Sequence, residues 1–149
     1  MRQLEESVMA LLLSGDEPAL VALRTQYQIA EVASIEFSGV GAFVNYRVPE
    51  PALITTPANF VLADIELELE QLEHSVSILL FVRDGKLSML EFATIDEPWP
   101  EELSIRKLGY LAEHSMGLNA YSLVPVANRD TKTLRRAIAR LTRHSRGTR

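Results

Sequence analysis

Asp84-Gly85, near the middle of the chain, constrains the fold more than any other pair of residues. It separates two apolar runs, 76–82 and 87–95. A two-residue type I′ turn needs positive φ at both central positions, and Asp-Gly is among the pairs that adopt it most readily. The sequence therefore predicts two antiparallel strands joined by this turn. The nearly unbroken apolar character of 76–82 predicts a central strand that is covered on both faces.

Alternation of apolar and polar residues predicts further strands at 33–37 and 42–48, because successive side chains of a strand point to opposite faces. The apolar face of the first is expected to hold Ala33, Ile35 and Phe37. Gly39-Val40-Gly41 lies between the two segments and predicts a hairpin turn or a bulge, since glycine adopts positive φ without a Cβ clash. Residues 49–57 contain three prolines and predict a loop.

Residues 61–70 alternate most regularly and predict another strand. Its apolar face is expected to hold Val61, Ala63, Ile65, Leu67 and Leu69. Its outer face is expected to hold the carboxylates of Asp64, Glu66, Glu68 and Glu70. Leu and Glu also favour a helix, but a helix would scatter these carboxylates around its circumference. We therefore interpret the segment as a strand.

Helical periodicity occurs at both ends of the chain. The apolar residues of 3–14 recur on one stripe, and Gly15 ends this predicted helix. Asp16 is expected to cap a second helix with Pro18 in its first turn, so that the two helices form a hairpin. Near the carboxyl end, Asp130 or Thr131 can cap a third helix. The apolar stripe of that helix is predicted to consist of Leu134, Ala137, Ile138 and Leu141.

These elements predict an α+β fold, with two amino-terminal helices packed on a mostly antiparallel sheet of about five strands and a basic amphipathic helix at the carboxyl end. A length of 149 residues suits one domain. We expect residues 1–128 to form that domain, and 129–149 to form a basic helix or tail docked on it or on a partner. The pattern leaves 101–117 open between helix and strand and predicts an extended segment at 121–126.

Opposite charges divide the chain. Residues 129–149 contain eight basic residues and one acidic residue, a net charge of +7, while the preceding 128 residues contain seven basic and nineteen acidic residues, a net charge of −12. Blocks of this kind are typical of interaction surfaces. We expect the carboxylates of 64–70 to face the basic helix across such a surface. The basic side chains expected there are those of Arg135, Arg136, Arg140 and Arg143.

The basic segment has two possible uses, docked or mobile. Docked, it lies on its own domain or on a second copy; mobile, it binds the phosphates of a nucleic acid. We favour docking, because the acidic body repels phosphates and the segment has no aromatic residue that could stack on bases.

Several chemistries are disfavoured. The chain has no cysteine, which excludes Cys-ligated metal centres and thiol catalysis. Its three histidines stand singly, and it has neither a phosphate-binding loop nor a nucleophile elbow motif. Alternate carboxylates on a strand lie about 6.5–7 Å apart, too far for most of them to share one cation. We therefore expect no metal and no cofactor, and a non-enzymatic protein rather than an enzyme.

Tyr46, Glu91 and Trp99 are the best candidates for a ligand-binding pocket. Glu91 lies near the end of an apolar strand, where a raised pKa would make it a general acid, and Trp99 could stack on a ligand. The simpler interpretation, which we favour, is that Trp99 covers the edge of the sheet and that Asp96 and Glu97 close a turn.

Two motifs resemble a group of small uncharacterised bacterial proteins. One is Gly39-Val40-Gly41-Ala42-Phe43. The other runs from Phe81-Val82-Arg83-Asp84-Gly85-Lys86-Leu87 through Leu90-Glu91 to Asp96-Glu97-Pro98-Trp99-Pro100-Glu101. The resemblance covers about residues 16–101 and implies a shared helix-then-sheet domain. It implies no activity, because none is assigned to that group, and the basic carboxyl-terminal segment lies outside it.

The sequence therefore favours a non-enzymatic protein-interaction module, such as a bacterial accessory or toxin-neutralising, immunity-like protein. The alternative is a small-ligand binder or enzyme with a pocket near Tyr46, Glu91 and Trp99; the third possibility is nucleic-acid binding through the basic helix. We expect a protein partner or a second copy. No apolar stretch suits a membrane span, and Glu5 and Glu6 disfavour an export signal, so we expect a soluble cytoplasmic protein.

Overall fold

The computed structural model describes the backbone of residues 1–147 and the side chains of residues 1–140. Within that range the chain forms three helices and eight strands. The helices are α1 (Arg2–Leu12), α2 (Pro18–Ile29) and α3 (Thr131–Gly147). The strands are β1 (Glu31–Phe37), β2 (Gly41–Arg47), β3 (Phe60–Leu62), β4 (Ile65–Leu69), β5 (Ser77–Arg83), β6 (Lys86–Ala93), β7 (Ile105–Ser115) and β8 (Tyr121–Val126).

The strands form two antiparallel sheets that meet at one point. The larger sheet has the order β1-β2-β6-β5-β3 and the smaller one β4-β7-β8. A bridge between Leu67 of β4 and Val76, next to the start of β5, joins them. The predicted α+β class is confirmed, although the sequence did not predict the smaller sheet as a separate unit. None of the helices in the described range is long and apolar enough to cross a membrane.

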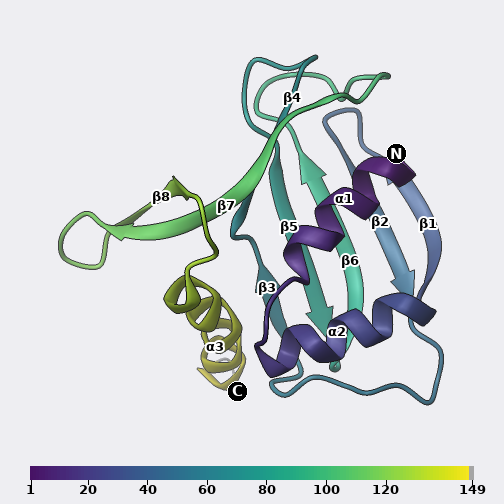
Figure 1. Cartoon of the computed structure of the whole chain (residues 1–149), viewed down its shortest axis with the longest axis vertical. Helices are drawn as coiled ribbons and strands as arrows, with labels where there is room; N and C mark the ends of the chain where they lie inside the picture. Colours follow the sequence, from purple (N-terminus) through teal and green to yellow (C-terminus); the bar gives the residue numbers. More distant parts are fainter. Residues whose placement is uncertain (148–149) are drawn as a thin grey trace.

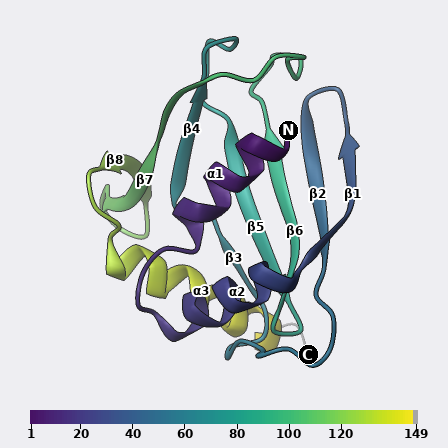
Figure 2. The same cartoon turned by 45° about the vertical axis from the view of Figure 1, so that its right-hand side comes forward.

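The two amino-terminal helices lie on the same face of the larger sheet, while α3 lies beside its edge strand β3 (Figures 1 and 2). Ile78 and Leu80 of β5 are buried beneath the helices. Leu79 and Phe81 point to the opposite face and are half-buried, so the prediction that this strand is covered on both faces is wrong. We call that opposite side the open face. It carries Phe43, Leu79, Phe81, Met89 and Glu91.

Both predicted hairpin turns form. Asp84 and Gly85 have φ values of 54° and 77°, as a type I′ turn requires, and they join β5 to β6. Gly39 has a φ of 90° in the turn between β1 and β2. The predicted apolar face of β1 holds for Ile35 and Phe37, which pair with the buried Val44 and Ala42, but a register shift between Val32 and Ser34 leaves Ala33 unpaired. Ala33 is exposed, and so is Phe37 at the end of this edge strand.

A buried carboxylate holds the predicted pair of amino-terminal helices to the sheet. Glu5 of α1 is fully buried and accepts hydrogen bonds from the hydroxyls of Tyr27 in α2 and Tyr46 in β2. One carboxylate therefore connects three elements. Pro18 begins α2 as predicted, but the N-cap residue is Glu17 and not Asp16.

The predicted strand at 61–70 is divided, because the chain changes sheets at Ala63-Asp64. β3 pairs with β5, whereas β4 pairs with β7. The change shifts the alternation by one residue, so that Leu62 and Ile65 are both buried. Asp64 is buried as well, at 3% exposed, and does not lie on an outer acidic face. We call this point the fork.

Beyond the fork, β7 and β3 diverge. The amide of Leu111 in β7 donates to the carbonyl oxygen of Asp64 at 2.8 Å. Two residues further along β7, the amide of Glu113 donates instead to the hydroxyl of Thr133 in α3 at 3.0 Å. The first turn of α3 thus lies in the gap between the diverging strands.

Arg129, just before α3, closes the fork. Two of its N–H groups donate to the carboxylate of Asp64, each at 2.8 Å. A third nitrogen donates to the carbonyl oxygens of Leu12 and Ser14 at the end of α1, at 2.7 and 3.0 Å. The guanidinium also lies 5.3 Å from the ring centroid of Tyr110 in β7. Arg129 therefore joins the fork, α1 and the start of α3, and its hydrogen bonds offset the desolvation of both charges.

The segment that the sequence left open forms most of the smaller sheet. Residues 105–115 form β7, and the predicted extended segment forms β8. Asp130 caps α3 as predicted: hydrogen bonds from the hydroxyl and amide of Thr133 hold the pKa of its carboxyl below the usual value. Leu134 and Ile138 of the predicted stripe are buried, while the side chain of Leu141 lies outside the described residues.

The ion pair at the fork should contribute much more stability than ion pairs at the surface. We expect Arg129→Met to lower the free energy of unfolding by about 3–5 kcal/mol, because it leaves the buried Asp64 carboxylate unpaired. Arg135→Gln is the matched control; it breaks an exposed pair with Glu17 and should cost about 0–1 kcal/mol. Chemical denaturation measures both values. Equal losses in the two variants would contradict a structural role for the fork.

The buried cluster around Glu5 predicts two tyrosines that do not ionise in the folded protein. Burial, followed by hydrogen bonding to Glu5, raises the pKa of both Tyr27 and Tyr46 above the ordinary value. At about pH 11, above the ordinary tyrosine pKa of about 10, folded wild type and Tyr46→Phe should therefore show the same phenolate absorbance. In denaturant the wild type should show one phenolate more. A difference between the folded proteins would disprove this burial.

Candidate functional site

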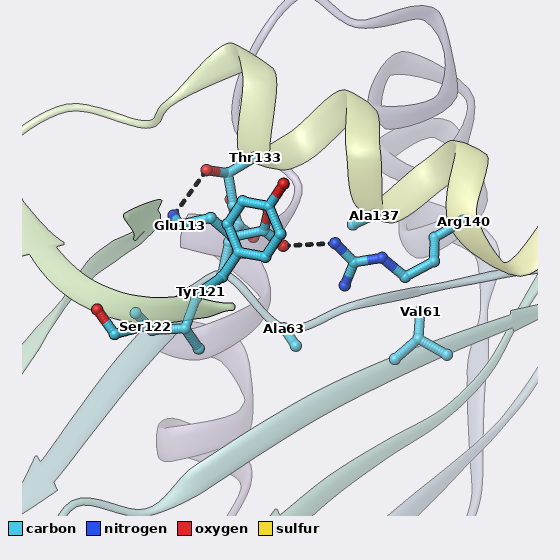
Figure 3. A pocket seen from close by; sticks show the side chains of 10 residues that line it. Val61, Ala63, Glu113, Tyr121, Ser122, Thr133, Ala137 and Arg140 are labelled. Atoms are coloured by element: carbon cyan, nitrogen blue, oxygen red, sulfur yellow. Dashed lines mark hydrogen bonds and ion pairs between the residues drawn. The ribbon is translucent and has the colours of Figure 1, made fainter. Parts of the chain in front are cut away.

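A groove of about 700 Å³ lies in the fork. Val61 and Ala63 form its floor, and they point away from the face that α1 and α2 cover, since Leu62 between them is buried beneath those helices. Tyr121 and Leu123 of β8 form one wall. The other wall is α3, with Ala137 above the floor (Figure 3). Its lining is mainly apolar.

The β7–β8 hairpin beyond the fork, residues 111–126, projects from the body of the molecule, and we call it the arm (Figure 1). At its tip, Met116 and Leu118 are 66% and 99% exposed. On the groove wall, Tyr121 and Leu123 are each 52% exposed. Exposed apolar side chains gathered in this way are typical of interaction sites. They continue the apolar lining of the groove outward along the arm.

The edge of the arm is poorly suited to pairing with another strand. β8 is the last strand of the smaller sheet, so one of its edges is free of partners within the sheet. Pro125 lies in this strand and has no backbone N–H to donate, a device that discourages pairing at exposed edges. The arm therefore offers its apolar side chains, rather than a complete row of edge amides, for contact.

Three charged side chains form the rim of the groove. Arg140 of α3 donates to one carboxylate oxygen of Glu113 at 2.6 Å, and Arg136 donates to the other at 3.0 Å (Figure 3 shows the first). The guanidinium of Arg136 also lies 5.1 Å from the ring centroid of Tyr121. The side chain of Arg136 is 48% exposed and that of Arg140 is 60% exposed, whereas that of Glu113 is 12% exposed. The rim therefore presents guanidinium groups to solvent above an apolar floor.

The electrostatics of the rim keep Glu113 ionised. Burial opposes the charge, but hydrogen bonds from Arg140 and Arg136 outweigh it and hold the pKa of Glu113 below the usual value. At neutral pH the ionised carboxylate therefore holds the arm to α3, and we call this contact the Glu113 clip. It also occupies part of the donor capacity of both arginines.

The basic helix meets carboxylates, but not the predicted ones. Arg135 pairs with Glu17 at 2.8 Å, while Arg136 and Arg140 share Glu113. The side chain of Arg143 lies outside the described residues.

The acidic row that was expected to face the helix is dispersed. Asp64 is buried against Arg129, and Glu66 lies 3.6 Å from Lys107 on the neighbouring strand. Glu68 is half-buried on β4, and Glu70 is exposed after the end of that strand. The division of the strand at the fork is the reason, since only Glu66 and Glu68 still share one face.

The structure does not bring Tyr46, Glu91 and Trp99 into one pocket. The register of β2 and β6 places Glu91 opposite Phe43 on the open face, whereas Tyr46 is buried with Glu5 on the helix-covered face. Trp99 packs on Phe92, with ring centroids 5.7 Å apart. It also lines a separate cavity of about 470 Å³. The shared pocket that the sequence offered as an alternative is therefore not formed, and the three side chains lie in different surroundings.

The residues that shape the groove were mostly missed in the sequence. Arg136 and Arg140 were singled out, and their spacing of four places both on one face of a helix. Glu113, Tyr121 and Leu123 were not, although Tyr121 and Leu123 alternate as they must on one face of a strand. Glu113 lies in the segment whose structure the pattern left open.

Among the described residues, no group of three or more His, Asp or Glu side chains is placed so that it could hold a metal ion. In comparisons with protein-family models, curated proteins and solved structures, none matched this chain.

The Glu113 clip should weaken in acid. Because its pKa is lower in the folded than in the unfolded chain, its stabilisation is present above the unfolded pKa of about 4.3 and is lost as pH falls through the lowered folded value. We expect the free energy of unfolding to fall less steeply between neutral and acidic pH in Glu113→Gln than in wild type. Arg135→Gln, which leaves the Glu113 pair intact, should show the same dependence of the free energy of unfolding on pH as wild type. Identical slopes in wild type and Glu113→Gln would contradict the clip.

Proposed function

We propose that this chain is a non-enzymatic protein-interaction module that holds a segment of another protein between the arm and α3. The observation that carries the proposal is the combination of a projecting hairpin with exposed apolar side chains and an apolar groove at its base. A groove of about 700 Å³ is of the size that ligands and peptide side chains occupy. A toxin-neutralising role would place a segment of the toxin here, and it stays a prediction from the sequence.

The disposition of the basic helix supports protein binding over nucleic-acid binding. Four arginines of the described part of this region, Arg129, Arg135, Arg136 and Arg140, are engaged with carboxylates of the same chain. A nucleic acid binds through many phosphates at once, and a long row of them would have to pass these carboxylates and the net charge of −12 on residues 1–128. The large exposed side chains of the arm include Met116, Leu118, Tyr121 and Leu123, and apolar groups of this kind suit contact with a protein surface.

Site-specific photo-crosslinking tests the proposal. A photo-crosslinking residue in place of Leu123 should yield covalent adducts with a defined protein when the variant is expressed in its native host. The matched control is the same residue in place of Ile95, which is also 52% exposed but lies after β6, outside the arm. Equivalent adduct patterns from both positions, or none from position 123, would argue against an interaction surface on the arm.

A further inference from the structure

We propose that the groove is selective for an acidic amphipathic segment, whose apolar side chains enter the groove while its carboxylates bind the guanidinium groups of α3. This inference rests on the proposed function and specifies the partner's chemistry. It assigns to the groove a preference for one charge, which apolar burial by itself would not supply.

The floor of the groove selects for apolar side chains. Val61 and Ala63 below, Leu123 on the arm and Ala137 on α3 present hydrocarbon to the space between them. Within the described residues, no buried side-chain nitrogen or oxygen lacks a hydrogen-bond partner. A polar side chain of a partner placed over Val61, Ala63 and Ala137 would lose water without gaining a hydrogen bond from these hydrocarbon side chains.

The rim selects for negative charge. Arg136 and Arg140 together carry two positive charges, and Glu113 neutralises one of them. Asp64, the other acid in the lining, is already matched by Arg129. A guanidinium has five N–H donors, and Glu113 takes one hydrogen bond from each arginine, so both can bind a second carboxylate. A lysine or arginine from a partner would instead meet like charges.

Glu113 acts as a built-in competitor for this site. Its carboxylate occupies the position between the two guanidinium groups that an acidic side chain of the partner would share. Removing its charge should therefore strengthen the attraction for an acidic segment, even though it weakens the contact between the arm and α3. This opposite effect on stability and on binding distinguishes a ligand site from a purely structural ion pair.

The groove also has room for more than one side chain. Val61 in its floor pairs with Phe81 of β5, so the groove opens onto the open face of the larger sheet. Phe81 and Met89 continue the apolar surface there. An extended segment that alternates apolar and acidic residues can direct the former to this surface and the latter to α3.

Fluorescence anisotropy with synthetic peptides tests the charge preference. The probe is a dye-labelled peptide in which Leu and Glu alternate, flanked by Gly-Ser pairs. One comparison peptide has Lys in place of each Glu, and another has Ser in place of each Leu. We expect the Leu/Glu peptide to bind at least about tenfold more tightly than either comparison peptide, with an affinity that falls as salt is raised.

Two variants with opposite expected effects connect this preference to the rim. Arg140→Gln should weaken binding of the Leu/Glu peptide roughly fivefold, and Glu113→Gln should strengthen it by a similar factor. Arg135→Gln, on the same helix but paired with Glu17 away from the groove, should leave the affinity unchanged. Circular dichroism confirms that each variant is folded before it is titrated. If Glu113→Gln is not folded, the comparison of Arg140→Gln with Arg135→Gln tests the inference, and equal affinities in these two variants would contradict it.

The possible outcomes separate this inference from the proposed function. The inference would be overturned if either comparison peptide bound as tightly as the Leu/Glu peptide. It would also be overturned if Glu113→Gln weakened binding of the Leu/Glu peptide. Displacement of the peptide by single-stranded RNA at physiological salt would overturn it in favour of phosphate binding. Crosslinking from position 123 without a charge preference would overturn only the inference, whereas a charge preference without crosslinking would overturn only the proposed function.

Discussion

The buried ion pair between Asp64 and Arg129 is the interaction on which the rest of the structure depends. The chain passes from β3 in the larger sheet directly into β4 in the smaller sheet, where β4 pairs with β7, so that β3 and β7 diverge at the fork. At the fork, backbone groups of the diverging strands lose their strand partners, and the carboxylate of Asp64 is buried in the interior. Arg129 compensates for both, because it binds Asp64 through two N–H groups and places the start of α3 in the gap. The same guanidinium caps the carbonyl end of α1.

The groove is a consequence of this arrangement. A continuous sheet would leave no space between β3 and the arm, whereas the fork opens that space and α3 fills it only in part. The Glu113 carboxylate then fixes the arm to α3 at a second point. The arm is thus held at its base and projects beyond it, with its apolar tip exposed (Figure 1). Stability is concentrated at the fork, and the surface available for a partner lies next to it.

Local patterns in the sequence predicted the parts of the fold that local chemistry determines. The Asp84-Gly85 turn, the helix at 3–14 and the Asp130 cap depend on neighbouring residues, and all three form. The division at Ala63-Asp64 was missed because a regular alternation continues through it, and only a distant arginine makes burial of Asp64 favourable. The predicted pairing of Arg135, Arg136 and Arg140 with the 64–70 carboxylates failed for the same reason, whereas Arg129, at the start of the basic segment, does bind Asp64. Glu113 could not be placed while the structure of 101–117 was open.

Hydrogen exchange at the fork tests this account most directly. In Arg129→Met, the amides of Leu111 and Glu113, which donate to Asp64 and to Thr133, should exchange much faster than in wild type. The amides of Leu80 and Leu90 in the larger sheet should accelerate less, by no more than the loss of global stability requires, because β5 and β6 pair with each other independently of the fork. Uniform acceleration across both sheets, or unchanged exchange at 111 and 113, would contradict the view that Arg129 holds the arm and α3 at the fork.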